Sequence, residues 1–261
     1  MKSKVKTLLS IKSAIFIIIQ LLFLLSSPVD GLAERRSVSL ATGEWPPYVS
    51  EYLVDNGMAA ELVAEVFKEV GIEVSNTFYP WTRALLSVEK GGCAGSYPWR
   101  KEVDREEFGL FSDELFSTEF MFFYYKNKFQ DNESLNAEKV YPYIVGVPLG
   151  YAQLEDLKKR GYRCKVITNS ANGILMLLKG HIDFLAEAEA VGDFLIRQLL
   201  MGREDEFGKI NAGLSPKPMR LIISKHDPDA EMLLEKFNKG LKKIKASGKY
   251  SMIMEKHEAM Y

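Results

Sequence analysis

The chain has 261 residues, of which 47% are hydrophobic and 26% charged, a composition typical of globular proteins. This composition excludes a disordered chain, a collagen-like fibre and a polytopic membrane protein. The formal net charge of −1 predicts no general attraction to nucleic acid or to an anionic membrane. Because the length is about twice that of a common domain, we expect two lobes that each bury their own core.

The first 33 residues are typical of a secretory signal peptide. Four lysines between Lys2 and Lys12 precede the apolar run 14–25, and Gly31-Leu32-Ala33 supplies the small residues of a cleavage site. A membrane anchor is the alternative, but a bilayer-spanning helix needs about 20 apolar residues and this run is shorter. We therefore expect cleavage after Ala33 and a mature chain in the periplasm.

The first half of the mature chain predicts alternating strands and helices. A strand at 37–41 leads into the aromatic, proline-rich loop 44–48. Apolar residues at helical spacing predict a helix over 58–70, which ends before Gly71. Further predicted elements are a strand at 72–78, a helix at 81–90, a strand at 93–97 and a strand buried on both faces at 120–125. The β-α-β-α-β order of the five elements between residues 37 and 97 favours a parallel sheet.

The second half predicts the same architecture without repeating the sequence. Its expected elements are strands at 143–147, 165–167, 182–186 and 219–223, and helices at 151–160, 171–179, 190–201 and from Asp229 onward. Lysines interleave with the apolar stripe of the last helix, which favours a solvated helix face over a nucleic acid patch. We expect residues 34–125 and 216–261 to form the first lobe and residues 126–215 the second.

Cysteines and histidines are too few and too scattered for a metal site. Cys93 and Cys164 could pair after export, but they fall in different predicted lobes, so two buried, unpaired thiols are favoured. His181, His226 and His257 are expected at the surface. No residue is therefore assigned as a catalytic acid or base, and we expect neither an enzyme nor a cofactor.

Aromatic side chains gather at the predicted carboxyl ends of the strands, where open α/β sheets bind ligands. All three tryptophans of the chain, Trp45, Trp81 and Trp99, stand beside such strand ends, together with Tyr48 and Tyr97. We expect these rings to line a ligand site. The alternative is that they only close the edge of the first lobe.

Arginines stand near the same edge. Arg83, Arg100 and Arg105 are candidates to hold a carboxylate, because a guanidinium in a desolvated cleft forms two parallel hydrogen bonds with it. Gly150 precedes a predicted helix whose first amides would supply a second anion contact; a simple turn is the alternative. The pattern favours a small ligand with an anionic group.

Seven short segments occur in an order and spacing found together in one known family. They are TGEWPPY at 42–48, EVG at 69–71, DREEFGLFSD at 104–113, GVPLG at 146–150, LKGHID at 178–183, FNKGL at 237–241 and GKY at 248–250. Through them residues 37–261 resemble the type II periplasmic solute-binding proteins of family 3, which include the polar amino acid receptors of ABC importers. The resemblance implies the α/β, two-lobe fold of that family, with two mostly parallel sheets flanked by helices and joined by two crossing segments.

The resemblance also implies roles for particular residues. The family's carboxylate-binding arginine falls on Arg105, its stacking aromatic ring on Trp45, and its second anion-binding loop on Gly150 and Tyr151. The chain departs from the family at Ala188, where members carry the acidic residue that holds an α-ammonium group.

Two acidic neighbours flank that departure. Glu187 or Glu189 would have to replace the missing acid, which puts an amino acid ligand in question. The bulky segment 97–100 also replaces the short hydroxyl residues common in the family, which implies a flatter or aromatic ligand.

The function that follows is capture of a small carboxylate-bearing solute, an amino acid or a related molecule, by hinge closure of two lobes. We expect a monomer that delivers this solute to an ABC permease in the inner membrane. The alternatives are a sensor that acts in trans on a signalling partner, and a periplasmic dehydratase-like enzyme of the same fold.

Overall fold

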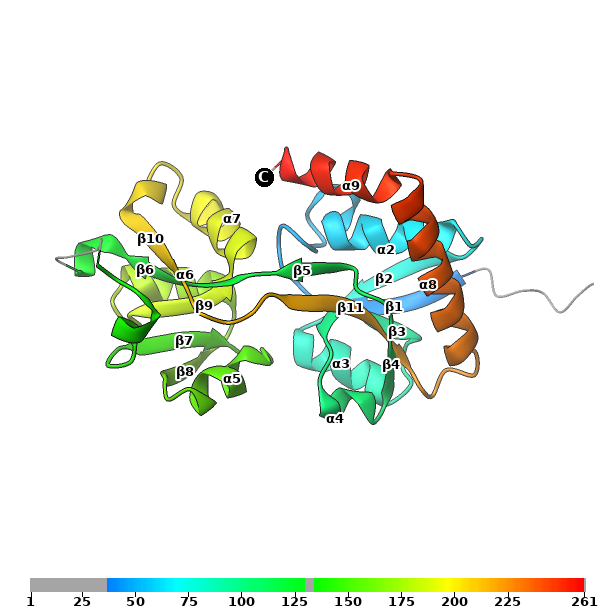
Figure 1. Cartoon of the computed structure of the whole chain (residues 1–261), viewed down its shortest axis with the longest axis horizontal. Helices are drawn as coiled ribbons and strands as arrows, with labels where there is room; N and C mark the ends of the chain where they lie inside the picture. Colours follow the sequence, from blue (N-terminus) through cyan, green and yellow to red (C-terminus); the bar gives the residue numbers. More distant parts are fainter. Residues whose placement is uncertain (1–36, 130–133, 261) are drawn as a thin grey trace, which may run out of the picture. The chain divides into compact units, whose positions relative to one another are not determined.

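The computed structural model describes residues 37–129 and 134–260, and the predicted signal peptide lies outside the described residues. One sheet contains β1 (Ser37–Thr42), β2 (Glu73–Phe78), β3 (Gly95–Arg100), β4 (Gly109–Phe111), β5 (Phe116–Thr118) and β11 (Lys217–Ser224). Its strand order is β2-β1-β3-β11-β4, and β5 also pairs with β11 (Figure 1). The first three strands are parallel and β11 is antiparallel to its neighbours.

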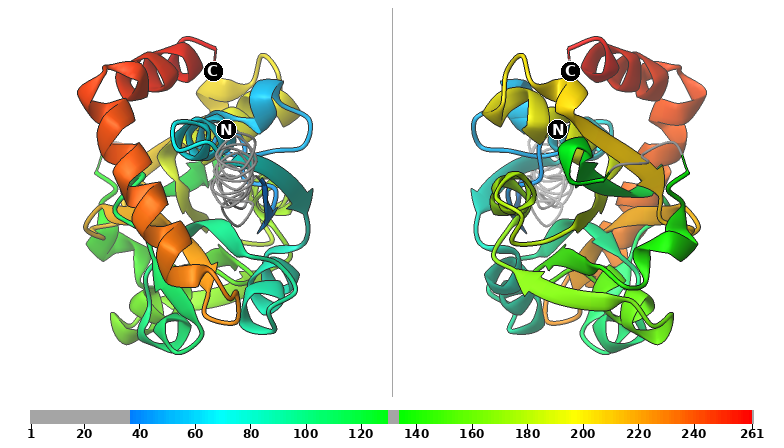
Figure 2. Two further views of the ribbon diagram at one scale, coloured as in Figure 1. Left: turned by 90° about the vertical axis from the view of Figure 1, so that its right-hand side faces the viewer. Right: turned by 90° about the vertical axis from the view of Figure 1, so that its left-hand side faces the viewer.

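Helices cover this first sheet. They are α2 (Met58–Lys68), α3 (Trp81–Glu89), the single turn α4 (Val103–Glu106), α8 (Ala230–Ala246) and α9 (Lys249–Glu258), with a 3-10 turn η1 (Val54–Asn56) before α2. Seen from the side of this sheet, α8 crosses in front and α9 continues from it (Figure 2). The apolar stripe of α8 is buried against α2, where the rings of Phe67 and Phe237 lie 4.9 Å apart. These two helices therefore close one face of the core.

The second sheet has the order β10-β6-β9-β7-β8. Its strands are β6 (Phe120–Tyr125), β7 (Ile144–Pro148), β8 (Arg163–Ile167), β9 (Phe184–Ala188) and β10 (Phe207–Asn211). Its helices are α5 (Gln153–Lys159), α6 (Ser170–Leu178) and α7 (Glu189–Leu199), with 3-10 turns η2 (Lys126–Lys128), η3 (Ala137–Val140) and η4 (Glu204–Glu206). Because β6 is antiparallel to both of its neighbours, β9 and β10, while β9, β7 and β8 are parallel, this sheet is mixed, like the first.

The chain passes from the first sheet to the second at Glu119, between β5 and β6, and it returns between Asn211 and Lys217. Residues 120–125, which we expected in the first lobe, pair with β9 and β10 of the second sheet instead. The apolar run correctly predicts a buried strand, but an apolar surface packs equally well in either core, so the sequence does not reveal which sheet receives it. The two crossing strands β5 and β11 lie side by side (Figure 1).

The long predicted elements are confirmed with small shifts of their ends, and three further expectations can be compared with the structure. Cys93 and Cys164 are free thiols, although each is half-buried and not enclosed. His181 and His226 are exposed as expected, but the expectation for His257 is wrong, because its side chain is 3% exposed and its Nε2 lies 2.6 Å from Glu61 Oε2. It is buried because α9, which the sequence pattern did not predict, packs on α2.

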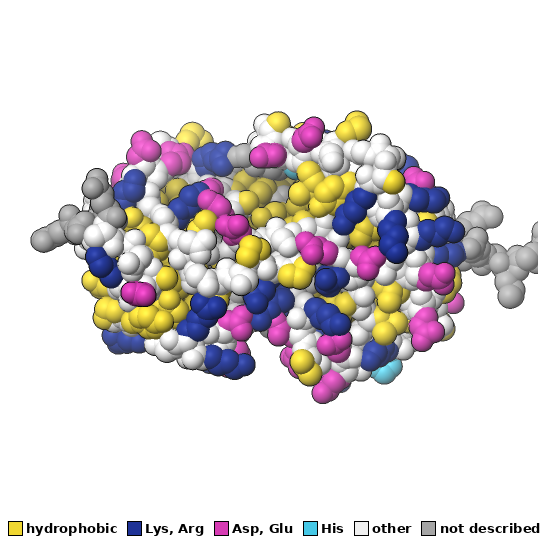
Figure 3. Space-filling view, in the orientation of Figure 1, with side chains coloured by type: hydrophobic (Ala, Val, Ile, Leu, Met, Phe, Trp, Pro, Cys, Tyr) yellow, Lys and Arg dark blue, Asp and Glu magenta, His cyan; other side chains and the backbone are white. Residues whose placement is uncertain are grey.

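Charged side chains form a mixed surface. Lysines and arginines alternate with aspartates and glutamates over the face shown in Figure 3. On α8, Lys239, Lys242 and Lys243 are exposed while the apolar stripe faces the core, as expected of a solvated helix face. Within the described ranges, no helix is long and apolar enough to cross a membrane.

The close approach of α2 and α8 yields a test of this packing. A Cβ atom on Gly240 would lie 2.3 Å from the backbone oxygen of Val66, which cannot move without shifting α2. Gly240→Ala should therefore lower the free energy of unfolding by about 1–3 kcal/mol, although alanine is the better helix former by about 1 kcal/mol. Thermal melts should show a decrease of several degrees.

The exposed Lys239→Ala on the same helix is the matched control and should melt within about a degree of the wild type. An unchanged or raised melting temperature for Gly240→Ala would show that the two helices are not packed as described.

Candidate functional site

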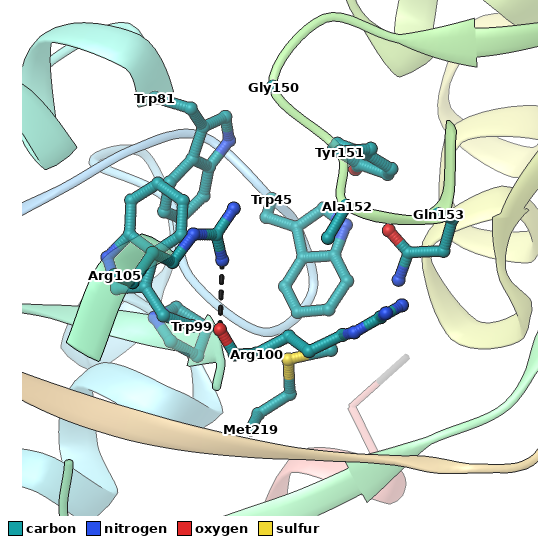
Figure 4. Close-up of a pocket in the computed structure, with 11 residues that line it drawn as sticks. Trp45, Trp81, Trp99, Arg100, Arg105, Gly150, Tyr151, Ala152, Gln153 and Met219 are labelled. Atoms are coloured by element: carbon teal, nitrogen blue, oxygen red, sulfur yellow. Dashed lines mark hydrogen bonds between the residues drawn. The ribbon is translucent and has the colours of Figure 1, made fainter. Parts of the chain in front are cut away.

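A pocket lies where residues that follow strands of both sheets meet (Figure 4). It is lined by Trp45, Trp81, Pro98, Trp99, Arg100, Arg105, Gly150, Tyr151, Ala152, Gln153 and Met219. The pocket, with the open solvent at its mouth, contains about 430 Å³ of space free of protein atoms. Rings and guanidinium groups therefore face a shared space from residues that follow strands of both sheets.

The indole rings are fixed by local backbone structure. Trp45 follows β1 and begins a tight turn in which its backbone amide donates to the oxygen of Val49 over 2.8 Å. Trp81 is the first residue of α3, and its Nε1 donates to the backbone oxygen of Glu44 over 3.1 Å. The ring of Trp99 meets that of Trp81 edge to face, with centroids 5.1 Å apart. These contacts hold three apolar faces around one cavity.

An irregularity in β3 determines which of its aromatic rings reaches the pocket. Opposite Tyr97 and Pro98 the pairing with β11 shifts, so that Ser96 faces Ile222 but Trp99 faces Arg220. Such a bulge changes the direction of the side chains that follow it. Trp99 consequently lines the pocket, whereas Tyr97 is fully buried in the main core of the protein.

Arg105 is a buried cation whose charge is not paired. Its side chain is 7% exposed, its Nη1 donates to the backbone oxygen of Arg100 over 2.9 Å, and its guanidinium lies 4.8 Å from the centre of the Trp99 ring. The Nε atom has no hydrogen-bond partner, and in the part of the chain that the structure describes no carboxylate forms an ion pair with this side chain. Burial lowers the pKa of Arg105. An anion in the pocket would offset this desolvation.

The second arginine of the pocket is already neutralised. Arg100 at the end of β3 forms an ion pair with Glu102 and another, at 2.7 Å, with Asp156 on α5. Because β3 belongs to the first sheet and α5 follows a strand of the second, the Arg100–Asp156 pair connects the two sides of the pocket.

Glu187 at the end of β9 forms a second connection between the two sides. Its buried carboxylate accepts hydrogen bonds from Trp45 Nε1 at 3.2 Å, from the Tyr151 hydroxyl at 3.0 Å, from the Ala188 amide at 2.7 Å and from the Ser170 hydroxyl. Burial raises the pKa of Glu187 to about 7. The carboxylate thus holds two pocket rings in place, one from each side.

The predicted site residues divide into three groups. Trp45, Trp81, Trp99, Arg105, Gly150 and Tyr151 line the pocket, and Glu187 lies behind two of these rings. Tyr48 lies outside, with its ring 4.7 Å from Trp45 and 5.0 Å from Phe116. Arg83 packs over the ring of Tyr79 at 4.5 Å, and neither Arg83 nor the enclosed Tyr97 is among the residues that line the pocket.

Several residues of the site were missed by sequence reasoning. Gln153 lines the pocket at the first turn of α5, Met219 reaches it from the crossing strand β11, and Ser170 donates to Glu187 from the first turn of α6. Gln153 follows the predicted loop 148–150 closely enough that its position could have been inferred. Met219 and Ser170 carry no signal in the sequence that points to a site.

The sequence and the fold can be compared with known proteins. Residues 39–259 match the family model described as bacterial extracellular solute-binding proteins, family 3. No curated protein sequence matches the chain.

Solved structures share the fold at low sequence identity. A histidine kinase sensor domain similar to periplasmic binding proteins superposes with a TM-score of 0.72 at 18% identity, covering 85% of this chain and 96% of that one. An ancestral arginine-binding protein bound to glutamine superposes with a TM-score of 0.71 at 23% identity, covering 85% of this chain and 97% of that one. An amino acid ABC transporter substrate-binding protein from Streptococcus pneumoniae, bound to L-arginine, superposes with a TM-score of 0.71 at 18% identity. The match covers 85% of this chain and 94% of that one.

The environment of Glu187 predicts a pH dependence of stability. Its pKa is raised from 4.5 to about 7, so the folded protein favours the protonated carboxyl group. The resulting stabilisation is fully present below the unfolded pKa of 4.5 and is lost as the pH rises through about 7. Relative to Glu187→Gln, the wild type should therefore lose up to about 3 kcal/mol between about pH 4.5 and pH 8.

Urea unfolding of both proteins at a series of pH values measures this difference. Glu189→Gln is the control, because Glu189 forms an ion pair with Lys209 at 2.8 Å and shows no such burial. A difference between wild type and Glu187→Gln that stays constant over this pH range would contradict the prediction.

Proposed function

Because the chain belongs to the bacterial extracellular solute-binding proteins of family 3, we propose that it captures a small solute bearing a carboxylate in the pocket between its two sheets. The observation that carries this proposal is the buried guanidinium of Arg105, which has an unpartnered Nε and no ion pair among the described residues. A carboxylate accepts two parallel hydrogen bonds from such a group, and its charge compensates the buried cation.

Aromatic rings supply the rest of the binding energy. Trp45, Trp81 and Trp99 present apolar surface beside the guanidinium, and each ring that stacks on a ligand contributes on the order of 1 kcal/mol beyond the burial of its area. Together with one charge-assisted contact, such anchors account for micromolar binding, which corresponds to about −8 kcal/mol.

Capture proceeds by opening and closing of two lobes around the crossing segments at Glu119 and at residues 212–216. Two polar contacts between described residues join the two sides of the pocket: Trp45 donates to Glu187, and Arg100 forms an ion pair with Asp156. Both bonds break when the sides separate. A solute that touches both sides then stabilises the closed form through its higher affinity for that form.

The proposed cellular role is delivery of the solute to an ABC permease by a monomeric periplasmic protein without catalytic activity. The similarity to the substrate-binding protein from Streptococcus pneumoniae supports this role, and residues 1–33 provide the predicted signal for export. An amino acid or a related carboxylate is the solute class that the names of the structural neighbours suggest.

A sensor that passes its closed form to a signalling partner is the second candidate. The similarity to a histidine kinase sensor domain favours it. Reconstitution with candidate membrane partners separates the two roles: a receptor stimulates ATP hydrolysis by a permease complex when its solute is added, whereas a sensor changes kinase autophosphorylation.

Arg105 provides the direct test of the binding proposal. In a thermal-shift screen against amino acids, small carboxylates and amines, the wild type should be stabilised by a carboxylate-bearing compound. Arg105→Ala should abolish this shift, and Arg105→Lys should reduce it, because lysine keeps the charge but loses the parallel pair of donors.

Arg163→Ala serves as the matched control, since Arg163 is exposed on β8 and its Nη1 donates only to the backbone oxygen of Pro142. The control should respond to the compound like the wild type. Equal ligand shifts in Arg105→Ala and in the wild type would refute the assignment of Arg105.

A further inference from the structure

The pocket contains cationic and neutral groups but no acid. Of the side chains that line it, Arg100 and Arg105 are cations, Gln153 is a neutral amide, and the others are apolar or aromatic. An α-amino acid carries an ammonium group beside its carboxylate. Such a group, when it enters a desolvated site without a carboxylate to receive it, loses hydration that nothing replaces.

Glu187 is the acid that could receive an ammonium group, and its acceptor capacity is already used. Two carboxylate oxygens offer about four lone-pair positions, and four donors occupy them: Trp45, Tyr151, Ser170 and the Ala188 amide. The side chain is fully buried and lines neither the pocket nor the neighbouring cavity next to Trp81 and Ser170.

The rings of Trp45 and Tyr151 line the pocket (Figure 4). Glu187 is hydrogen-bonded to the polar atoms of both rings. Glu187 is therefore placed as a positioning residue. Its hydrogen bonds orient the indole of Trp45, which follows a strand of the first sheet, and the phenol of Tyr151, which follows a strand of the second. To reach its oxygens, an ammonium group would have to displace at least one of these donors and leave a buried polar atom without a partner.

Glu44 is a carboxylate in the neighbouring cavity, and it does not change this conclusion. Its side chain is exposed to water, and its Oε1 accepts the backbone amide of Glu51 over 2.9 Å. Glu44 is not among the residues that line the pocket of Arg105, so only a ligand that extends into the neighbouring cavity would present a cation to it.

We propose that the pocket selects carboxylates with a flat, apolar body and no ammonium group over the α-amino acids of the same shape. Arg105 receives the carboxylate, the three indoles and Tyr151 enclose the ring, and Glu187 keeps two of these walls in place. This inference rests on the proposed function, since it assigns a substrate class to the same site.

Pairs of compounds that differ only in the ammonium group test the inference. Indole-3-propionate is compared with L-tryptophan, and 3-phenylpropionate with L-phenylalanine, by isothermal titration calorimetry on the wild-type protein. We expect each propionate to bind at least about tenfold more tightly than its amino acid, because the site offers the ammonium group no partner. An amino acid that binds as tightly as its propionate, or more tightly, overturns the inference.

Glu187→Gln separates a positioning role from an ammonium-binding role. As a positioning residue, Glu187 affects the walls that both compounds touch, so the substitution should weaken both members of a pair by similar factors and leave their ratio within about twofold. A selective loss of amino acid binding would identify Glu187 as the receptor of the ammonium group and overturn the inference. Glu189→Gln is the control, and the wild-type comparison stands even when a variant does not fold.

The same titrations distinguish failure of the inference from failure of the proposed function. Binding of L-tryptophan or L-arginine that depends on Arg105, without binding of the propionates, keeps the proposed function and overturns the inference. Tryptamine has no carboxylate. If it binds in preference to indole-3-propionate and L-tryptophan, both the inference and the proposed function are overturned. Both are also overturned if none of the carboxylates tested binds.

Discussion

An arginine side chain removed from water without a counter-ion is costly, and the site is organised around that constraint. Arg105 lies in a single turn of helix whose other charged residues do not reach it as ion-pair partners within the described ranges. Its guanidinium lies over an indole and donates to a backbone oxygen, which satisfies part of its hydrogen-bonding capacity. Asp104 and Glu102 compensate the charge only at a distance, without an ion pair among the described residues, and this gives an anionic ligand more to gain here than at a solvated arginine on the surface.

A buried carboxyl group behind the pocket walls complements this cation. Glu187 is joined to Trp45 by a hydrogen bond across 142 positions of sequence, so a residue at the end of β9 orients a ring that follows β1. The four donors around Glu187 explain how the protein tolerates the acid in its interior, and the raised pKa reflects what that burial still costs. The site therefore combines a cation that has no ion pair among the described residues with a buried carboxyl group whose four hydrogen-bond donors all come from the protein.

Much of the fold follows from local sequence patterns, because helices such as α2 and α8 carry long apolar stripes and the core strand β6 carries a continuous apolar run. Short strands such as β4 and β5 contain three residues each, too few for a periodic signal.

The tryptophans were predicted together from their places after strands, and the pocket contains all three. Tyr97 and Arg83 could not be placed in this way, because a bulge in β3 and a local contact with Tyr79 decide where they lie. Partners distant in sequence, such as Ser170 and Met219, become neighbours of the site only through the fold.

The pairing of the two crossing strands joins mechanics to recognition. Met219 on β11 is paired with Phe116 on β5, and Phe116 stacks on Tyr48, whose ring lies against Trp45. Met219 is also part of the pocket wall. If the lobes move as proposed, a solute in the pocket would contact the strands that join the lobes, so its size would act on the hinge itself. In such an arrangement, the size and shape of the solute would determine its affinity and also the extent to which the two lobes close.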